Sequence, residues 1–205
     1  MSFDELLTRV STGLARPLPG ANAHARMAPR VKREWPPGFN LAHVRHAASL
    51  LLLAPHGNSA KVILTVRAHA LERHGGQVSM PGGVIEPDES FADAAVREAH
   101  EEIGLDPAIV QVLGALTPID IMVSGFRMHP IVASVAALPT LRPDPREVAR
   151  ILEVPLDDLR DQSRVVWGTR QREGRGVEFP AFPFDGAEIW GATAMALAEF
   201  MALLD

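Results

Sequence analysis

The sequence predicts an α/β domain in which helices pack on a β-sheet. Two apolar runs, 47–53 and 61–66, flank the turn PHGN and are typical of a strand hairpin. Helical patterns near 90–103 and 193–204 alternate with further apolar segments of strand length. Strands that alternate with helices favour a layered α/β architecture.

Composition and charge limit the classes of function. The 205 residues fit one domain with appendages, and 47% hydrophobic with 22% charged residues is ordinary for a folded chain. A net charge of −5 argues against nucleic-acid or membrane partners, and the absence of cysteine excludes disulfides and cysteine-bound zinc. Because the start lacks the features of a signal peptide and no run reaches the roughly 20 apolar residues of a membrane span, we expect a cytoplasmic enzyme or binding module.

The first 40 residues differ in composition from the rest. An amphipathic pattern at 3–15 predicts a short helix, and the Pro-, Gly- and Ala-rich stretch after it is typical of a linker. We therefore divide the chain into an N-terminal helix with its lead-in, 1–40, and a main domain, 41–205.

After the hairpin, the main domain continues with a loop, 67–83, that leads into the central helix. Ser90 is a capping residue at the start of this helix, and Gly104 is a stop after its end. Strands are then predicted within 109–116 and 128–138. The remaining segments are a strand followed by a turn at 146–159, and a stretch at 167–186 that is a long loop or packed hairpin, or alternatively a lid or dimer contact.

The central helix carries three acids on one arc, Glu98, Glu101 and Glu102. Like charges at this spacing cost roughly 0.2–0.5 kcal/mol per pair. A solvated acidic face is the ordinary interpretation, but a divalent cation would relieve the repulsion, because Mg²⁺ favours carboxylate oxygen and takes further ligands from water and phosphate. The stripe predicted to face the core is Ala92, Val96, Ala99 and Ile103.

The residues around this helix match a longer pattern, Gly-x5-Glu-x7-Arg-Glu-aliphatic-x-Glu-Glu-x-Gly-aliphatic. The stretch resembles the Nudix box. The resemblance implies a Nudix fold over the main domain, with a mixed β-sheet sandwiched between α-helices (α/β/α), and a loop–helix–loop that holds Mg²⁺ or Mn²⁺ against a diphosphate. The matching residues are Gly83, Glu89, Arg97, Glu98, Glu101, Glu102, Gly104 and Leu105.

Cleavage of a diphosphate by such a site needs acids that position the metal ions and a base that activates water. We expect Glu98 and Glu102 to be metal ligands, with Glu101 as a third ligand or as the base. Glu98 is an equal candidate for the base, and spacing alone does not decide between them.

The neighbours of these acids have supporting roles in this interpretation. We expect Arg97 to orient Glu101, to which it is spaced i,i+4, and Glu89 to brace the loop. Gly82 and Gly83 allow the backbone to approach the metal or the phosphate closely, although a plain tight turn is the alternative for both.

The segment before the box suggests a substrate. ILTVRAHALERHGGQVSMPGG, 63–83, resembles the signature of the coenzyme A pyrophosphatase branch of the family, with Glu72 and Met80 in place of its usual Arg and Phe. That branch implies hydrolysis of coenzyme A or acyl-coenzyme A to 3′,5′-ADP and 4′-phosphopantetheine or its acyl form.

Coenzyme A carries an additional phosphate, which needs cations. Arg67, Arg73 and His74 are the nearest to the box in sequence, and arginine forms bidentate hydrogen bonds with phosphate. The charge reversal at Glu72 supports a second hypothesis, a Nudix hydrolase of another nucleoside diphosphate derivative such as ADP-ribose or NADH. A third is a non-catalytic Nudix-like nucleotide-binding domain, against which the intact acids argue. A homodimer is compatible with all three.

A few other residues are weaker candidates. Glu147 is a candidate for positioning metal or water, and Trp190 and Phe126 are predicted to lie in the core or to line the pocket. Three isolated histidines at spacings unlike a metal site are predicted to have surface or structural roles: His69, His100 and His129.

Overall fold

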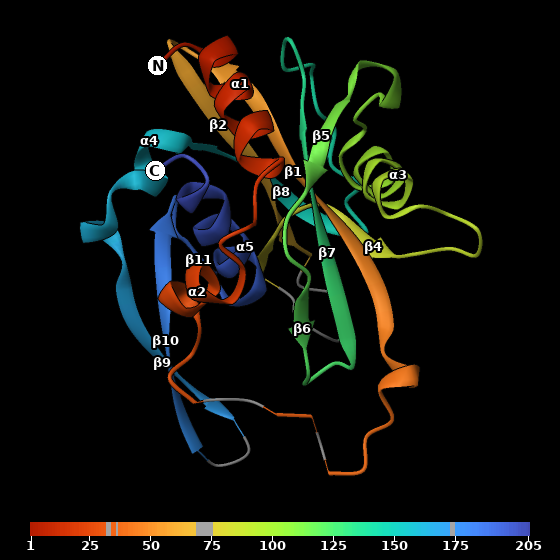
Figure 1. The fold of residues 1–205 in the computed structure, drawn as a ribbon, viewed down its shortest axis with the longest axis vertical. Helices are drawn as coiled ribbons and strands as arrows, with labels where there is room; N and C mark the ends of the chain where they lie inside the picture. The colour runs from red at the N-terminus through yellow and green to blue at the C-terminus, as the bar shows by residue number, and fades with distance from the viewer. Residues whose placement is uncertain (32–33, 36, 69–75, 173–174) are drawn as a thin grey trace.

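A computed structural model describes residues 1–31, 34–35, 37–68, 76–172 and 175–205 (Figure 1). Within these residues the chain forms a large mixed sheet with helices on both faces, together with a smaller three-stranded sheet. The predicted α/β class, with a central mixed sheet between helices, is confirmed.

The large sheet is built around the predicted hairpin. Strand β1 (Arg45–His56) pairs antiparallel with β2 (Ser59–Arg67) and parallel with β7 (Phe126–Ser134). The strand order of the large sheet is β3-β2-β1-β7-β5. In addition, β4 pairs with β1, β6 pairs with β7, and β8 pairs with β2. These other strands are β3 (Val78–Ser79), β4 (Gly82–Val84), β5 (Gln111–Ala115), β6 (Ile119–Ile121) and β8 (Val148–Pro155).

The apolar run in β1 reflects burial on both faces. Leu51 and Leu53 belong to one hydrophobic cluster, whereas Leu50 and Leu52 belong to a second cluster on the opposite face. Successive strand residues point to opposite faces, so a continuous apolar run is expected only where both faces are covered. This is why the pattern reads as leucine after leucine rather than as an alternation.

Helix α3 (Phe91–Ile103) covers one face of the sheet. Its predicted limits are confirmed: the Ser90 side chain accepts from the Asp93 amide, and Gly104 ends the helix with φ 67°. The predicted core stripe is right only in part, because Ala92 and Val96 are partly exposed. The residues that are buried are instead Ala94, Ala95, Ala99, Glu102 and Ile103, since small alanines let the helix approach β1 and β4 and turn Glu102 inward.

The other face is covered by α1 (Phe3–Leu14) and α5 (Gly191–Ala202). Both helices were expected from the sequence. Leu6 and Val10 of α1 are buried in the same cluster as Phe200 of α5. The Pro- and Gly-rich lead-in contains a further short helix, α2 (Gly20–His24), which packs on α5 and which composition did not reveal.

The second sheet has the order β11-β10-β9 and lies beside α5 (Figure 1). Its strands are β9 (Val166–Arg172), β10 (Arg175–Phe184) and β11 (Ala187–Trp190). The hairpin alternative for 167–186 is therefore the observed one. The turn expected after β8 is a short helix, α4 (Leu156–Arg160). No helix in the described part of the chain combines the length and apolarity that a membrane crossing requires.

Candidate active site

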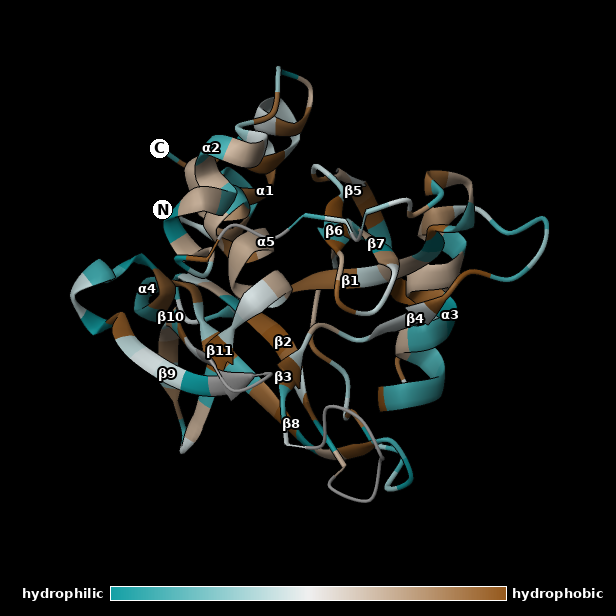
Figure 2. Cartoon of the chain, turned by 90° about the horizontal axis from the view of Figure 1, so that it is seen from below, coloured by the Kyte–Doolittle hydropathy of each residue, from teal (hydrophilic) through white to brown (hydrophobic). Residues whose placement is uncertain are grey.

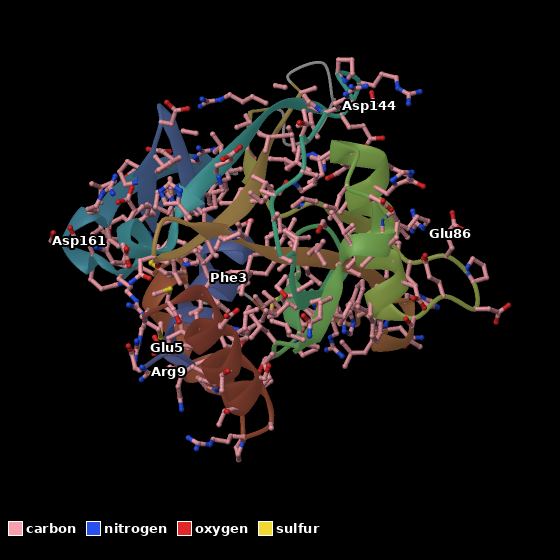
Figure 3. All side chains as sticks on the ribbon, turned by 90° about the horizontal axis from the view of Figure 1, so that it is seen from above. Phe3, Glu5, Arg9, Glu86, Asp144 and Asp161 are labelled. Carbon is pink, nitrogen blue, oxygen red and sulfur yellow. The ribbon has the colours of Figure 1, made fainter. Side chains whose placement is uncertain are left out.

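The candidate site lies where β4 and α3 meet. Strand β4 pairs with β1, with Gly82 opposite Ser49 and Gly83 opposite Ala48. Helix α3 packs on both strands. The loop between β4 and α3, which carries Glu86, extends away from the sheet before the chain returns into the helix (Figure 3). Two glycines of one strand thus face the acids of the helix.

Gly83 lies directly against the Glu98 carboxylate. A Cβ atom at Gly83 would lie 2.4 Å from Cδ and 2.5 Å from either carboxylate oxygen of Glu98. No side chain larger than hydrogen fits without moving the acid. The position therefore requires glycine because of a close approach rather than because of a left-handed backbone.

Gly82 holds the second acid. Its amide donates to Glu102 Oε2 at 3.2 Å, and Glu102 is only 3% exposed. Burial raises the pKa of Glu102 to about 7, against the opposing effects of the Gly82 hydrogen bond and the Arg67 charge. The pKa of Glu98 is also raised, again chiefly by burial.

Arg97 connects the acids and the loop. Its Nε and Nη2 donate to the two carboxylate oxygens of Glu89 at 2.9 and 3.1 Å, and Nη2 also donates to Val84 O at 3.1 Å. Nη1 donates to Glu98 Oε1 at 3.0 Å and to Glu101 Oε2 at 3.2 Å. The predicted contact of Arg97 with Glu101 is present as one hydrogen bond, whereas Arg97 makes two hydrogen bonds with Glu89. The hydrogen bonds from Arg97 lower the pKa of Glu89.

Glu147 comes to this site from a distant part of the sequence. The β2–β8 pairing shifts register at the end of β2, where the Ala68 amide donates to Glu147 O at 2.8 Å. The Glu147 charge contributes to the raised pKa values of Glu98 and Glu102. The loop before it also caps α3, since the Asp144 amide donates to Glu102 O at 2.9 Å, and Figure 3 shows Asp144 beside that end of the helix.

A cavity of about 860 Å³ opens beside the acids. Seen from below, β1, β3 and β4 lie between α3 on one side and β9 and β11 on the other (Figure 2). Arg67, Gly82 and Gly83 line the end of the cavity nearest the acids. The Ser49 hydroxyl in the same wall is buried and has no hydrogen-bond partner among the described residues.

The remaining walls of the cavity come from distant segments, and sequence reasoning did not identify them all. Phe126 and Trp190 line it, as one of the two alternatives for them predicted. Residues 28–31 of the lead-in and Trp167 of β9 were not predicted to do so. No spacing pattern links these positions, because only the tertiary fold brings them together. Four methionines add to the apolar lining: Met80, Met122, Met128 and Met195.

Part of the predicted cationic loop, 69–75, lies outside the described residues. Arg73 and His74 lie outside the described residues, as do Glu72 and His69.

The other two histidines have neighbours of their own. His100 Nδ1 lies 2.9 Å from Leu105 O. His129 is buried, stacks on Phe91 at a centroid distance of 3.6 Å and lies with its Nε2 2.9 Å from His46 Nδ1. Burial, followed by the charges of His46 and Arg127, lowers the pKa of His129 to about 4. Both histidines thus have structural contacts.

The donor set suits a hard divalent cation that shares its ligands with a substrate. Within the described residues, no three His, Cys, Asp or Glu side chains are grouped so that they could hold a metal ion by themselves. Mg²⁺ is commonly bound through one or two carboxylates plus phosphate oxygens and water. Glu102, which is buried against Gly82, and Glu98, which is partly buried against Gly83, are the two carboxylates that fit this requirement.

Comparisons with known sequences agree on one family. The model described as NUDIX domain matches residues 43–172. Over 171 residues, covering 83% of this chain and 88% of the relative, the sequence is 38% identical to the uncharacterized Nudix hydrolase NudL of Pectobacterium atrosepticum. It is 36% identical over 159 residues to NudL of Yersinia enterocolitica, covering 77% of this chain and 80% of that protein.

Solved structures share the fold. A Nudix hydrolase from M. smegmatis, RenU, superposes with a TM-score of 0.51 at 24% identity, covering 78% of this chain and 84% of that one. The C. elegans Ap4A hydrolase in a binary complex gives a TM-score of 0.53 at 16% identity, covering 78% and 98% respectively. At these identities the likeness concerns the fold alone.

Proposed function

The chain belongs to the Nudix hydrolase family, and from this premise we propose that it hydrolyses the diphosphate bond of coenzyme A or acyl-coenzyme A. The products would be 3′,5′-ADP and 4′-phosphopantetheine or its acyl form. As predicted from the sequence, we propose a cytoplasmic location and a small nucleotide as the partner.

One observation carries the choice of substrate. The segment 63–83, which resembles the coenzyme A pyrophosphatase signature, contributes seven described residues to the cavity wall next to the acids. Its lining residues are Arg67, Gln77, Val78, Ser79, Met80, Gly82 and Gly83. A volume of about 860 Å³ is near the upper end of ordinary ligand pockets, which suits a substrate with long arms on both sides of its diphosphate.

Nudix hydrolases generally use divalent metal ions such as Mg²⁺ or Mn²⁺. We propose that Glu98 and Glu102 hold such an ion here, with Glu101 as a third ligand or as the base. The bound ion would neutralise phosphate charge and lower the pKa of water. The two glycines let the backbone lie close to the diphosphate, and Arg97 keeps the Glu98 carboxylate in place.

The protein groups must also accept the proton of the attacking water. Glu101 is 56% exposed and is held by Arg97, so it can exchange protons with solvent. Glu98 is 15% exposed and lies against Gly83, closer to the cavity wall. We keep both as candidates for the base. Arg67, whose charge acts on Glu102, would bind a phosphate oxygen at this end.

The test is an assay of coenzyme A, ADP-ribose and NADH, each with Mg²⁺ or Mn²⁺, followed by identification of the products. The proposal expects coenzyme A to be cleaved most efficiently, with 3′,5′-ADP among the products. Cleavage of ADP-ribose while coenzyme A survives would contradict it and favour the second hypothesis. Nucleotide binding without any cleavage would favour a non-catalytic domain.

A further inference from the structure

The wall of the cavity formed by the lead-in and β9 carries a planar cation stacked on an exposed indole. The Arg30 guanidinium carbon lies 4.3 Å from the centroid of the Trp167 ring, and both residues line the cavity. Trp167 is 52% exposed although its side chain is large and apolar. An exposed aromatic ring that borders a cavity is available to stack on a ligand.

Long-range contacts hold this pair in place. The Arg30 amide donates to Glu178 O at 3.1 Å, and Arg30 Nη1 donates to Glu178 Oε2 at 2.6 Å. Helix α2, which precedes Arg30 in the lead-in, is fixed by Glu199, which accepts from His24 Nε2 at 2.8 Å and from the Gly20 amide at 3.0 Å. The lead-in is therefore tied to α5 through α2, and to β10 at Arg30, where it borders the cavity.

Arg30 retains capacity for a ligand. The ion pair with Glu178 is exposed on both sides, with 63% and 51% of the two side chains accessible. Exposed pairs of this kind are worth about 0–1 kcal/mol, and a guanidinium has five N–H donors. An anion could therefore bind Arg30 with or without the Glu178 contact.

The two arginines that line the described walls of the cavity stand on different walls. Arg67 ends β2, and its charge acts on Glu102, so it belongs to the acid end. Arg30 belongs to the lead-in and lies over β9. A substrate whose diphosphate lies at the acids would meet a second cation, next to an aromatic ring, at the other wall.

We propose that Arg30 and Trp167 form a subsite for the adenosine 3′-phosphate part of the substrate. The purine ring stacks on the face of the indole that Arg30 does not cover, and the guanidinium binds the 3′-phosphate. This inference rests on the proposed function. The pantetheine arm is neutral and flexible and needs neither group, whereas base stacking and a charge-assisted phosphate contact match both of them.

The test compares coenzyme A with dephospho-coenzyme A, which lacks only the 3′-phosphate. Arg30→Ala is expected to lower kcat/KM for coenzyme A by about tenfold, the value of one charge-assisted hydrogen bond, and for dephospho-coenzyme A by less than about twofold. Trp167→Ala is expected to lower kcat/KM for both substrates, because both carry the purine, and Trp167→Phe to restore most of it. An equal loss for both substrates with Arg30→Ala, or no loss, would overturn the phosphate assignment.

Arg164→Ala is the matched control. Arg164 also lies over an aromatic ring, 5.1 Å from the Phe182 centroid, and pairs with Asp158 at 2.7 Å, but it does not line the cavity. Its loss is expected to leave kcat/KM unchanged for both substrates. A loss specific to coenzyme A in this variant would mean that any surface arginine produces the effect.

A binding measurement separates this inference from the proposed function. If the wild-type protein does not cleave coenzyme A, the proposed function fails. Calorimetric titration with 3′,5′-ADP and with 5′-AMP then still tests the subsite, because it needs no turnover. We expect the wild type to bind 3′,5′-ADP about tenfold more tightly, and Arg30→Ala to remove this preference. Equal affinity, or binding of neither nucleotide, would overturn the subsite.

Discussion

The acid end and the wall formed by the lead-in and β9 are built in different ways. The acids and glycines of the first end come from 82–102, and a single arginine, Arg97, connects them. The other wall joins Arg30 to Trp167 and Glu178, which are far apart in sequence and meet only in the folded protein. The candidate catalytic residues therefore come from one short segment, whereas the residues proposed to select the substrate are brought together by long-range contacts.

The largest expected effect tests the local end. We expect Glu102→Gln to lower kcat by at least about a hundredfold, equivalent to about 2.7 kcal/mol in the activation barrier, because the amide is a poor ligand for a divalent ion. The fold should survive, since a neutral group at this buried position avoids the cost of burying a charge. Steady-state kinetics and circular dichroism would measure the two effects.

Glu86→Gln is the matched control for that substitution. Glu86 lies in the loop before α3 and is exposed (Figure 3). The Glu86→Gln substitution removes one negative charge near the site but leaves Glu98, Glu101 and Glu102 unchanged, so kcat should change by less than about twofold. A wild-type rate in Glu102→Gln would contradict the assignment of Glu102 to the metal site.

The next prediction separates two adjacent glycines. Gly83→Ala places its Cβ against the Glu98 carboxylate, which can swing away, so activity should fall by more than about tenfold with little loss of stability. A Cβ at Gly82 would instead lie 2.3 Å from Ala48 O and 2.6 Å from Ser49 Cα, which are backbone atoms. Gly82→Ala should therefore cost about 1–3 kcal/mol in the free energy of unfolding.

Parallel measurement of kcat and of denaturant midpoints would test this pair. The comparison fails if both substitutions destabilise equally, because the Glu98 carboxylate would then be as immobile as the backbone. It also fails if Gly83→Ala keeps full activity.

The local end was the part most accessible from sequence. Helix start and stop signals predicted the helix with its cap at Ser90 and its end at Gly104, and the spacing of the acids predicted that they share one arc. It did not predict that Glu102 is buried, because an assumed arc of three acids says nothing about how closely alanines let a helix approach a sheet. Glu147 was only a weak candidate, since the β2–β8 register that brings it near is a tertiary feature.

The other wall was almost inaccessible from sequence. The lead-in reads as a linker because proline, glycine and alanine carry no periodic pattern, yet Gly20 and His24 are fixed by hydrogen bonds to Glu199. The sequence of 167–186 is compatible with both a loop and a hairpin, since Pro and Gly interrupt its alternation. The sequence of the C-terminal helix does not reveal that Glu199 is buried and accepts hydrogen bonds from the N-terminal segment.

Glu199 anchors the lead-in that forms this wall, so its substitution should weaken the wall. Glu199 is fully buried and accepts four hydrogen bonds, from Gly20, His24 and Thr117. Glu199→Gln places an amide N–H₂ among these donors, so we expect a loss of about 1–3 kcal/mol in the free energy of unfolding. In activity, KM for coenzyme A should rise a few-fold while kcat stays the same, since only the wall with Arg30 is loosened. A fall in kcat at unchanged KM would show that the two ends are coupled.

The smallest expected effect is the pH dependence of that anchor. Burial alone would raise the pKa of Glu199, but hydrogen bonds from His24, Thr117 and Gly20 outweigh it, so the pKa lies below the ordinary 4.5. Between the two values the unfolded chain binds more protons than the folded one, so the contribution of Glu199 to stability is complete above pH 4.5 and is lost as the pH falls through the folded pKa. The difference in stability between wild type and Glu199→Gln should therefore be constant above this pH and should narrow below it. Urea midpoints from pH 6 downward at fixed ionic strength, set to about 0.1 M to hold screening constant, would measure this. A difference that stays constant in acid would mean that the anchor depends on the shape of the side chain and not on its charge.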